Sequence, residues 1–391
     1  MKKYNLITPE GTKDVLFEEC IERRNLQKKI TAIFEARGYN EVITPGIEYY
    51  DVFDIENAGI PQEEMYKSTD NHGRLLVFRP DLTLPIARLA ATRLHNHSLP
   101  LRLYYNQPVW RNRPDLSGRS DESTQTGIEL MGAEGLRADL EVITTAAQVM
   151  KACGRDFRIE IGHAAIFRIF ADKLPISEEL KEEIRSIIES KNYAALSEIL
   201  DNMEDTSYVK ALKHLPRLFG AEEVFEEAAE YCTDPKAQEI LDYLRTLYKS
   251  LEKLGLGNRI MVDLGLVQRN DYYTGVVFSA YEYGHGEAVL MGGRYDKLLS
   301  SFGAPMAACG FAVDVDALTS MAIKNRMPVL PAPEILVHGL EGYEMEAQLE
   351  LMELIDEGQR AEVSVFATLE EAEKYAAEKG IKEIVVVGDE I

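Results

Sequence analysis

Several polar side chains occur in short segments whose residue types could bind a small charged ligand. Asp81 and Thr83 follow an Arg-Pro pair, Tyr272 and Tyr273 are adjacent, and residues 292–296 read Gly-Gly-Arg-Tyr-Asp. Carboxylates and hydroxyls accept hydrogen bonds from a cation, and an arginine can hold a carboxylate. Taken one at a time, each segment also has a structural interpretation: the Asp and the Thr could cap a helix, the tyrosines could be core residues, and the glycines could form a turn. The choice depends on whether the fold brings these segments together.

Other common chemistries are not indicated by the sequence. The four cysteines (Cys20, Cys153, Cys232 and Cys309) are scattered without a CxxC pair, which is typical of reduced, buried thiols. The seven histidines have no metal-ligand spacing, and His285 lies between two glycines in a segment typical of a turn. No glycine-rich loop that would cradle a phosphate is recognisable. We therefore expect no metal site and no cofactor.

The composition limits the class of protein. With 391 residues the chain is too long for one compact core, so two or three domains are expected. Hydrophobic residues make up 46% and charged residues 28%, an ordinary globular balance. The first residues form no apolar run typical of a signal peptide, and no stretch approaches the roughly 20 apolar residues of a membrane span, so a cytoplasmic protein is expected. The formal net charge of −23 argues against binding tRNA, which needs Lys and Arg against its phosphates.

The first half of the chain predicts one long helix followed by strands. In the segment 18–37, Leu26, Ile30, Ile33 and Phe34 fall on one face of a 3.6-residue period, and Gly38 follows as a helix end. Strands are expected over residues 41–45, 75–78, 101–110 and 127–131. The polar stretch 111–125 lies between the last two, which suggests a hairpin whose loop covers a ligand.

The second half predicts a helical insertion and a separate tail. Residues 174–256 favour helices throughout, with Ser177 as an N-cap and further helices over 222–231 and 235–254. Strands are expected at 259–264, 274–281, 287–291 and 311–315. After the prolines at 328, 331 and 333, three buried strands (334–339, 362–366, 383–387) alternate with helices (345–357, 369–379), an order that implies a small parallel sheet.

Five segments, taken in order, are similar to the signature motifs of the class II histidyl-tRNA synthetase core. They resemble motif 1, the Arg-Pro-Glu-Gly-Thr segment, motif 2, the first histidine-specific motif, and the second histidine motif followed by motif 3. In this chain they are Gly38 to Pro45, Arg79 to Thr83, Arg111 to Gly132, Leu266 to Tyr273, and Gly292 to Asp296 with Gly310 to Ala312. Each motif is weak alone, but five in the same order across residues 8–320 are a strong match.

The resemblance implies the fold and its domains. We expect an α+β protein with a class II synthetase-like antiparallel sheet flanked by helices. The core would span residues 1–325, with the helical insertion at about 174–256, and residues 326–391 would form a truncated α/β domain similar to the family's anticodon-binding domain. In the family the motif 1 region builds the dimer interface, so a homodimer through that region is implied here.

The resemblance also implies a histidine pocket in which the family's amino-acid contacts are retained. The α-amino group would be held by a set of acceptors, the carboxylate by one arginine, and the imidazole by tyrosines. The matching positions are Asp81, Thr83, Gln125 and Glu129 for the amine, Arg111 for the carboxylate, and Tyr273 and Tyr295, with Tyr272 beside them, for the ring. Glu129 alone could equally be an exposed strand residue.

The family's ATP contacts are replaced in this chain. The motif 2 glutamate that accepts from adenine aligns with Arg113, a side chain that only donates. The arginine of the first histidine motif aligns with Gln268, and the motif 3 arginine aligns with Ala317; a glycine of motif 3 aligns with Asp314. A polyanionic nucleotide needs fixed positive charge, and each lost donor removes roughly 2.7–4 kcal/mol of stabilisation. We therefore expect no adenylation and no catalytic residues.

The tail departs from a tRNA-binding surface. Residues 330–391 contain sixteen Asp and Glu against four Lys and Arg, a net charge of −12, which should repel RNA. A histidine pocket without ATP or tRNA recognition is similar to the regulatory subunits of ATP phosphoribosyltransferase, a family of non-catalytic synthetase paralogues. The resemblance implies a hetero-octamer with the catalytic subunit, activation of that subunit, and feedback inhibition by histidine in the first step of histidine biosynthesis.

Two other functions remain open from the sequence. One is a divergent but active histidyl-tRNA synthetase. The other is a synthetase-like binding protein for another ligand or an RNA-related partner. Within the regulatory interpretation, histidine could bind in the pocket described above or at a subunit interface.

Overall fold

The computed structural model describes residues 4–55, 59–113, 120–154, 156–267, 272–325 and 328–388. The chain divides into two compact units, residues 1–327 and residues 328–391. Within the described ranges, no helix combines the length and the apolar character that crossing a membrane requires.

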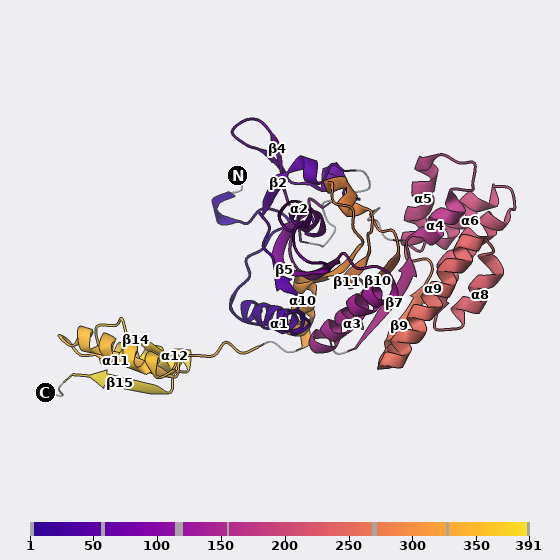
Figure 1. Ribbon diagram of the computed structural model, residues 1–391. Coiled ribbons are helices and arrows are strands. Elements are labelled where there is room, and N and C mark those ends of the chain that lie inside the picture. Colours follow the sequence, from indigo (N-terminus) through magenta and orange to yellow (C-terminus); the bar gives the residue numbers. More distant parts are fainter. Residues whose placement is uncertain are drawn as a thin grey trace. The chain divides into compact units, whose positions relative to one another are not determined.

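The larger unit is organised around a nine-stranded sheet (Figure 1) in the order β1-β5-β6-β12-β11-β10-β7-β9-β8. The pairs β1–β5 and β7–β9 are parallel, and the other pairs are antiparallel. The strands are β1 (Asn40–Glu41), β5 (Leu101–Trp110), β6 (Glu122–Met131), β7 (Phe157–His163), β8 (Phe219–Gly220), β9 (Ile260–Asp263), β10 (Val276–Glu282), β11 (Ala288–Arg294) and β12 (Ala308–Asp314). This architecture confirms the expected α+β, synthetase-like fold.

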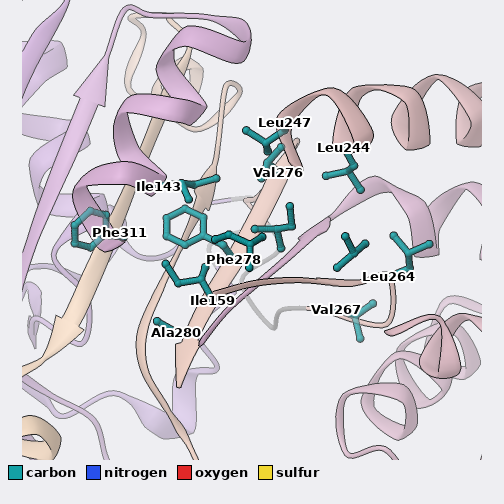
Figure 2. Close-up of a cluster of buried hydrophobic side chains, with 14 of the residues drawn as sticks. Ile143, Ile159, Leu244, Leu247, Leu264, Val267, Val276, Phe278, Ala280 and Phe311 are labelled. Atoms are coloured by element: carbon teal, nitrogen blue, oxygen red, sulfur yellow. The ribbon is translucent and has the colours of Figure 1, made fainter. Parts of the chain in front are cut away.

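One face of the sheet is covered by α1 (Phe17–Ala36), α3 (Gly135–Cys153) and α10 (Val315–Asn325). The predicted apolar face of α1 is buried, with Leu26, Ile30 and Phe34 at most 1% exposed. Gly38 follows that helix at a φ of +80°, a conformation that glycine adopts without strain. In Figure 2, side chains of α3 and α9 meet side chains of β7, β10 and β12 in the centre of this core.

The opposite face carries a second apolar cluster beneath α2 (Thr83–Arg93). The N-terminal part of the chain also forms a small antiparallel sheet, in the order β2-β4-β3. Its strands are β2 (Ile47–Tyr49), β3 (Lys67–Thr69) and β4 (Leu75–Phe78), and the short helices η1 (Tyr4–Leu6), η2 (Tyr50–Val52), η3 (Gln62–Glu64) and η7 (Leu298–Phe302) complete the unit. Because strand side chains alternate, the two faces hold different residues of the same strands.

The expected insertion is mainly but not entirely helical. Residues 174–256 contain α5 (Glu178–Glu189), α6 (Tyr193–Asp201), α7 (Ser207–His214), η4 (Leu215–Arg217), α8 (Val224–Tyr231), α9 (Pro235–Leu251) and η5 (Glu252–Leu256). The helix α4 (Ala165–Ala171) precedes this segment, and η6 (Gly257–Arg259) follows it. The Ser177 hydroxyl accepts a hydrogen bond from the backbone N–H of Leu180, as the predicted N-cap should. The expectation of helices alone was wrong at Phe219–Gly220, where β8 pairs with β9 and ties the insertion to the main sheet.

The strand expected over residues 41–45 was also wrong in extent, because β1 ends at Glu41. The backbone of Thr44 is satisfied by side chains instead: its N–H donates to Gln107 Oε1 at 3.1 Å, and its carbonyl accepts from Gln107 Nε2 at 2.9 Å and from Arg79 at 2.7 Å. These buried side chains replace the strand partner that Thr44 lacks.

The smaller unit is the three-stranded parallel sheet that the alternation of strands and helices predicts, and its strands lie in the order β14-β13-β15. Its elements are β13 (Ile335–Gly339), α11 (Glu344–Asp356), β14 (Ala361–Val363), α12 (Leu369–Lys379) and β15 (Glu383–Val387). The two helices bury different apolar clusters. The expectation of three buried strands was correct only for β13, because β14 and β15 are sheet edges and stay partly exposed.

Candidate functional site

The hairpin of β5 and β6 supplies the base of the candidate site. Its register places Glu129 opposite Leu103 of β5 and opposite Gly310 of β12. Gln125 lies four pairs further along, opposite Gln107 and Asp314. Side chains two residues apart share a face, so Gln125 and Glu129 both point to the face beneath α2. The hairpin expected from the sequence is therefore present, and its second strand begins earlier than predicted, at Glu122.

Glycines give this face the room that a site needs. Gly293 of β11 pairs with Gly310 of β12, so two neighbouring strands carry no side chain here. A Cβ at Gly310 would lie 2.0 Å from Glu129 Oε2, and a Cβ at Gly293 would lie 2.7 Å from the Tyr273 ring. The interpretation of the Gly292-Gly293-Arg294 segment as a turn was wrong, because these residues form the end of β11.

Three of the residues predicted to bind the ligand's amine, Asp81, Thr83 and Glu129, lie close to one another. The Thr83 hydroxyl donates to Glu129 Oε1 at 2.9 Å, and the Tyr295 hydroxyl donates to Glu129 Oε2. Asp81 Oδ1 accepts from the backbone N–H of Leu84 at 3.0 Å, so this carboxylate does cap the first turn of α2. The structural and the site interpretations of Asp81 are thus both consistent with its position. Glu129 is only 1% exposed, which contradicts its interpretation as an exposed strand residue.

Burial raises the proton affinity of both carboxylates. Burial raises the pKa of Glu129 to about 8, the hydroxyl donors of Tyr295 and Thr83 oppose this shift, and the charge of Asp81 adds to it. Burial likewise raises the pKa of Asp81, against the opposing charge of Arg111. Two buried acids with one arginine nearby form a site that a second cation would stabilise.

Aromatic side chains cover the acids. The ring centroids of Tyr272 and Tyr273 lie 4.8 Å apart, and Tyr295 lies 5.8 Å from the first and 6.4 Å from the second. The sequence reasoning missed Tyr105, which is 1% exposed and whose pKa is raised well above its usual value by burial, with Glu129 and Asp81 adding to the effect. Only the strand register, which places Tyr105 opposite Gly127, indicates that this residue belongs to the site.

Arg111 and Gln125 lie at the more exposed end of the site, where both are half-buried. Arg111 Nε donates to the carbonyl of Pro80 at 2.8 Å, which fixes the guanidinium beside the Asp81 segment. Gln125 Oε1 is buried and has no hydrogen-bond partner within the described part of the chain. Both side chains therefore retain capacity to bind a ligand.

The site is closed by its own side chains. Tyr272, Tyr273 and Tyr295 are 5%, 7% and 1% exposed, and Asp81 and Thr83 are 7% and 8% exposed. A ligand of amino-acid size needs these rings to turn aside before it can reach the carboxylates. Among the described residues, no group of His, Cys, Asp and Glu side chains is arranged to hold a metal ion.

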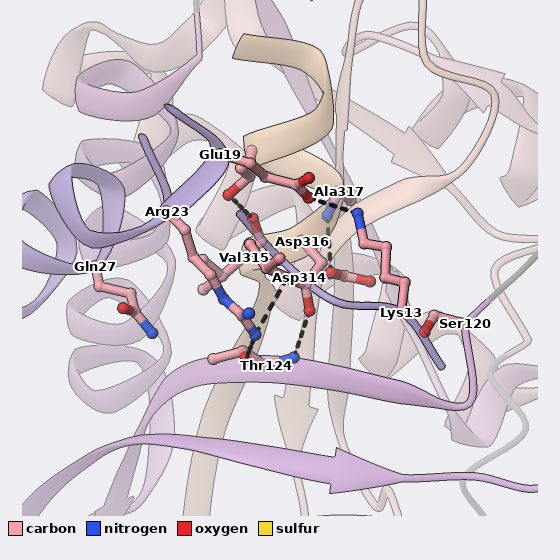
Figure 3. A network of polar contacts seen from close by, with 12 residues as sticks. Lys13, Glu19, Arg23, Gln27, Ser120, Thr124, Asp314, Val315, Asp316 and Ala317 are labelled. Carbon is pink, nitrogen blue, oxygen red and sulfur yellow. Dashed lines mark hydrogen bonds and ion pairs between the residues drawn. The ribbon is translucent and has the colours of Figure 1, made fainter. Parts of the chain in front are cut away.

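The expected ATP side of the pocket contains a network of internal polar contacts (Figure 3). Asp314 Oδ1 accepts from the backbone N–H of Ala317 at 2.9 Å, so two of the replaced positions bind each other. Burial raises the pKa of Asp314, while the charge of Arg113 lowers it, which places those two replaced positions in electrostatic contact. Gln268, the fourth, lies outside the described residues.

Neighbouring residues extend this network. Asp316 accepts from the backbone N–H of Thr124 at 2.7 Å and pairs with Arg23 at 3.3 Å, while Arg23 also donates to the Thr124 hydroxyl. Figure 3 shows these contacts linking α1, β6 and the start of α10. The charged side chains of Arg23, Asp314 and Asp316 are thus bound by groups of the chain itself.

Comparison with known sequences gives a consistent family match. The histidyl-tRNA synthetase family model matches residues 11–318. An ATP phosphoribosyltransferase regulatory subunit of Clostridium acetobutylicum is 40% identical over 390 residues, covering 98% of this chain and 95% of that protein. The protein of the same description from Bacillus mycoides is 38% identical over 395 residues, covering 98% and 92%.

Solved structures agree with the sequence relatives. A structure described as an ATP phosphoribosyltransferase regulatory subunit/histidyl-tRNA synthetase from Bacillus halodurans has a TM-score of 0.86 at 29% identity and covers 100% of both chains. A histidyl-tRNA synthetase from a Nostoc species has a TM-score of 0.77 at 20% identity, covering 99% of this chain and 92% of that one, and shows the fold alone.

Proposed function

The chain belongs to the family of ATP phosphoribosyltransferase regulatory subunits, built on the histidyl-tRNA synthetase core, and from this membership we propose that it binds histidine in its synthetase-like pocket to control a separate catalytic subunit. The chain is then a non-catalytic component of the first step of histidine biosynthesis, in the cytoplasm. It activates the catalytic subunit and relays feedback inhibition by histidine.

The arrangement around Glu129 carries the proposal for the ligand. Two hydroxyls, of Thr83 and Tyr295, fix this carboxylate in a buried position, and Asp81 lies close enough to raise its pKa. An ammonium group beside both acids would remove the cost of burying two like charges and would make charge-assisted hydrogen bonds. A free amino acid supplies such a group.

The remaining contacts select an amino acid with an aromatic ring. Arg111 is fixed near Asp81 and can pair with the ligand's carboxylate, and the partnerless Gln125 Oε1 can accept from its amine. The tyrosine cluster of Tyr272, Tyr273 and Tyr295 offers flat apolar surfaces and hydroxyls for an imidazole. Recognition at both ends and at the ring favours histidine.

The ATP side supports a regulatory role and not a ligase. A triphosphate placed near α10 would meet the half-buried carboxylate of Asp314, and Ala317 offers it no charge. The charge of Arg113 acts on that carboxylate, and a guanidinium cannot accept a hydrogen bond from an adenine amine. The acidic C-terminal unit likewise favours a protein partner over tRNA.

The proposed assembly is a homodimer through the motif 1 region that joins the catalytic subunit in a hetero-octamer. A large apolar side chain of motif 1, Ile43, is 76% exposed in the single chain. Ile47 and Tyr49, which follow motif 1 in β2, are also exposed. Covering such a surface is what an isologous dimer interface does.

Regulation then follows from linkage. Histidine must bind one state of the complex more tightly than another, because a ligand with equal affinity for both states shifts nothing. By reciprocity, the catalytic subunit must change the affinity of this chain for histidine by the same factor.

Two measurements test the proposal. Isothermal titration of the full chain with histidine should show saturable binding, and histidinol, which lacks the carboxylate that Arg111 would hold, should bind at least about tenfold more weakly. A pull-down with a short ATP phosphoribosyltransferase catalytic subunit should retain that subunit and not tRNA. No histidine binding by the chain or its complex would refute the pocket, and histidine-dependent exchange of pyrophosphate into ATP would make the chain a synthetase.

A further inference from the structure

A second candidate site lies on the opposite face of the main sheet. Here a surface cavity of about 470 Å³ opens between the end of α1, the start of β5, the flank of α3 and η5. Arg102 of β5 pairs with Leu130 of β6, next to the pair of Leu103 and Glu129. Because side chains alternate along a strand, Arg102 points away from the tyrosine-covered pocket. The volume lies within the range of about 300–1,000 Å³ that is usual for small-molecule sites.

Three arginines from three separate elements line this cavity: Arg37 at the end of α1, Arg102 in β5 and Arg137 in the first turn of α3. Glu141 is the one carboxylate among the lining residues. Such a concentration of positive charge is unexpected in a chain with a net charge of −23. The first turn of α3 contains no acidic residue, so the positive end of that helix adds to the local potential.

The internal contacts of these arginines leave donors available. Arg102 binds Glu141 through Nε at 2.7 Å and Nη2 at 2.8 Å, and Tyr39 donates to the same carboxylate at 3.0 Å. Glu141 is therefore already neutralised. Arg37 uses its Nε to bind Gln148, a neutral partner, at 2.7 Å, and its charge also acts on the Glu141 carboxylate that Arg102 already binds.

Arg137 differs from the other two. Its side chain is exposed and has no hydrogen bond or ion pair within the ranges that the structure describes. One carboxylate, Glu141, thus faces three arginines around one cavity, so the lining keeps an excess of positive charge. Like charges held this close repel each other, and a multivalent anion between them would replace that repulsion with charge-assisted hydrogen bonds.

The rest of the lining limits the kind of anion. Leu140 and Leu254 present apolar surface, and Leu254 is 60% exposed in the single chain. Thr144 supplies a hydroxyl. We propose that this arginine cavity binds a phosphorylated small molecule, with its phosphate against Arg37 and Arg137 and an apolar part against the two leucines. The proposal does not depend on the histidine pocket.

Titration calorimetry of the full chain tests this with four probes at low salt: inorganic phosphate, inorganic pyrophosphate, AMP and adenosine. We expect pyrophosphate and AMP to bind and adenosine to bind at least about tenfold more weakly than AMP, because the phosphate carries the recognition. Tight binding of phosphate alone would identify the free ion as the ligand, and preference for AMP would identify the phosphate ester.

Variants locate the site. Arg137→Gln and Arg37→Gln should each weaken pyrophosphate and AMP by about tenfold or more. Arg217→Gln, at an exposed arginine of η4, should leave both unchanged. Leu254→Ser should weaken AMP and spare pyrophosphate.

Because Arg137 is exposed and unpaired, its substitution should not alter the melting temperature, and that measurement excludes a folding defect. The proposal is wrong if none of the probes binds below about 10 mM. It is also wrong if the Arg37 and Arg137 variants bind like wild type, or if only an acidic protein partner responds to them.

Discussion

Thr83 and Glu129 join the first turn of α2 to the middle of β6 through one buried hydrogen bond of 2.9 Å. Tyr295 adds a second donor to the same carboxylate from the end of β11. Three elements that are distant in the sequence thus fix the carboxylate of Glu129. A change of its rotamer would break both hydrogen bonds. The position of Glu129 is therefore set before any ligand arrives, which is the condition for selective binding.

Removing the charge of Glu129 should weaken histidine binding with little change in fold. We expect Glu129→Gln to raise the Kd for histidine by about 10- to 100-fold, because a hydrogen bond to a charged group contributes about 1.5–3 kcal/mol. Glu122→Gln, at an exposed position of the same strand, is the matched control and should bind like wild type. Isothermal titration measures both. Equal affinities for the two variants would place the histidine site elsewhere, for example at a subunit interface.

Stability should depend on pH through the same residue. Burial raises the pKa of Glu129 from 4.5 to about 8. An acid that holds its proton more tightly when folded stabilises the fold fully below about pH 4.5, and this contribution is lost as the pH rises through about 8. Between pH 5 and pH 8 the free energy of unfolding of wild type should therefore fall by about 1–3 kcal/mol more than that of Glu129→Gln. Urea denaturation of both proteins at the two pH values measures the difference, and parallel curves would contradict the shift.

Histidine binding should release a proton near neutral pH. An ammonium group placed beside Glu129 favours the carboxylate form and lowers a pKa that burial has raised to about 8. Calorimetric titrations at pH 7 should then give apparent enthalpies that become more negative as the ionisation enthalpy of the buffer increases, because the buffer takes up the released proton. Glu129→Gln should reduce this buffer dependence. Proton uptake on binding would be the opposite sign and would exclude this role for the carboxylate.

Asp314 should stabilise the chain without supporting nucleotide chemistry. Its carboxylate caps the first turn of α10 at Ala317, so Asp314→Gly should lower the free energy of unfolding by about 1 kcal/mol. Restoring the glycine that the synthetase family has at this position should still give no histidine-dependent exchange of pyrophosphate into ATP, because Arg113 and Ala317 are unchanged. Thermal unfolding and the exchange assay measure the two effects. Recovery of exchange would show that Asp314 alone blocks ATP.

The exposed motif 1 surface should control self-association. We expect Ile43→Glu to weaken the homodimer at least about tenfold, because a carboxylate would be buried in an apolar interface. Tyr283→Glu is the control, since that side chain is 88% exposed in a turn outside motif 1. Sedimentation velocity over a concentration series distinguishes them. A monomeric wild-type chain, or a dimer indifferent to Ile43→Glu, would exclude this interface.

Local patterns predicted much of the fold. The spacing of Leu26, Ile30 and Phe34 was sufficient for α1, and Ser177 marked the start of α5. The strand over residues 41–45 was wrong because Gln107, distant in the sequence, satisfies the backbone of Thr44. No local pattern contains that contact.

The sequence predicted which residues could form the candidate site, but it did not predict how they are arranged in space. Ordered motifs identified Asp81, Thr83 and Glu129, and the structure brings the last two into contact. Tyr105 was missed because its place in the site depends on which residue of β6 lies opposite it. Strand register is decided by tertiary packing, so it could not be taken from the periodicity of either strand.

The tyrosine lid over the acids also has a consequence for timing. Rings that are only 1–7% exposed would admit the proposed ligand only during brief openings. Association should then be slower than encounter by diffusion, and its observed rate should level off at high histidine as opening becomes the limiting step. Release would be limited in the same way. A sensor built like this would average over short fluctuations in histidine and respond to sustained changes in its supply.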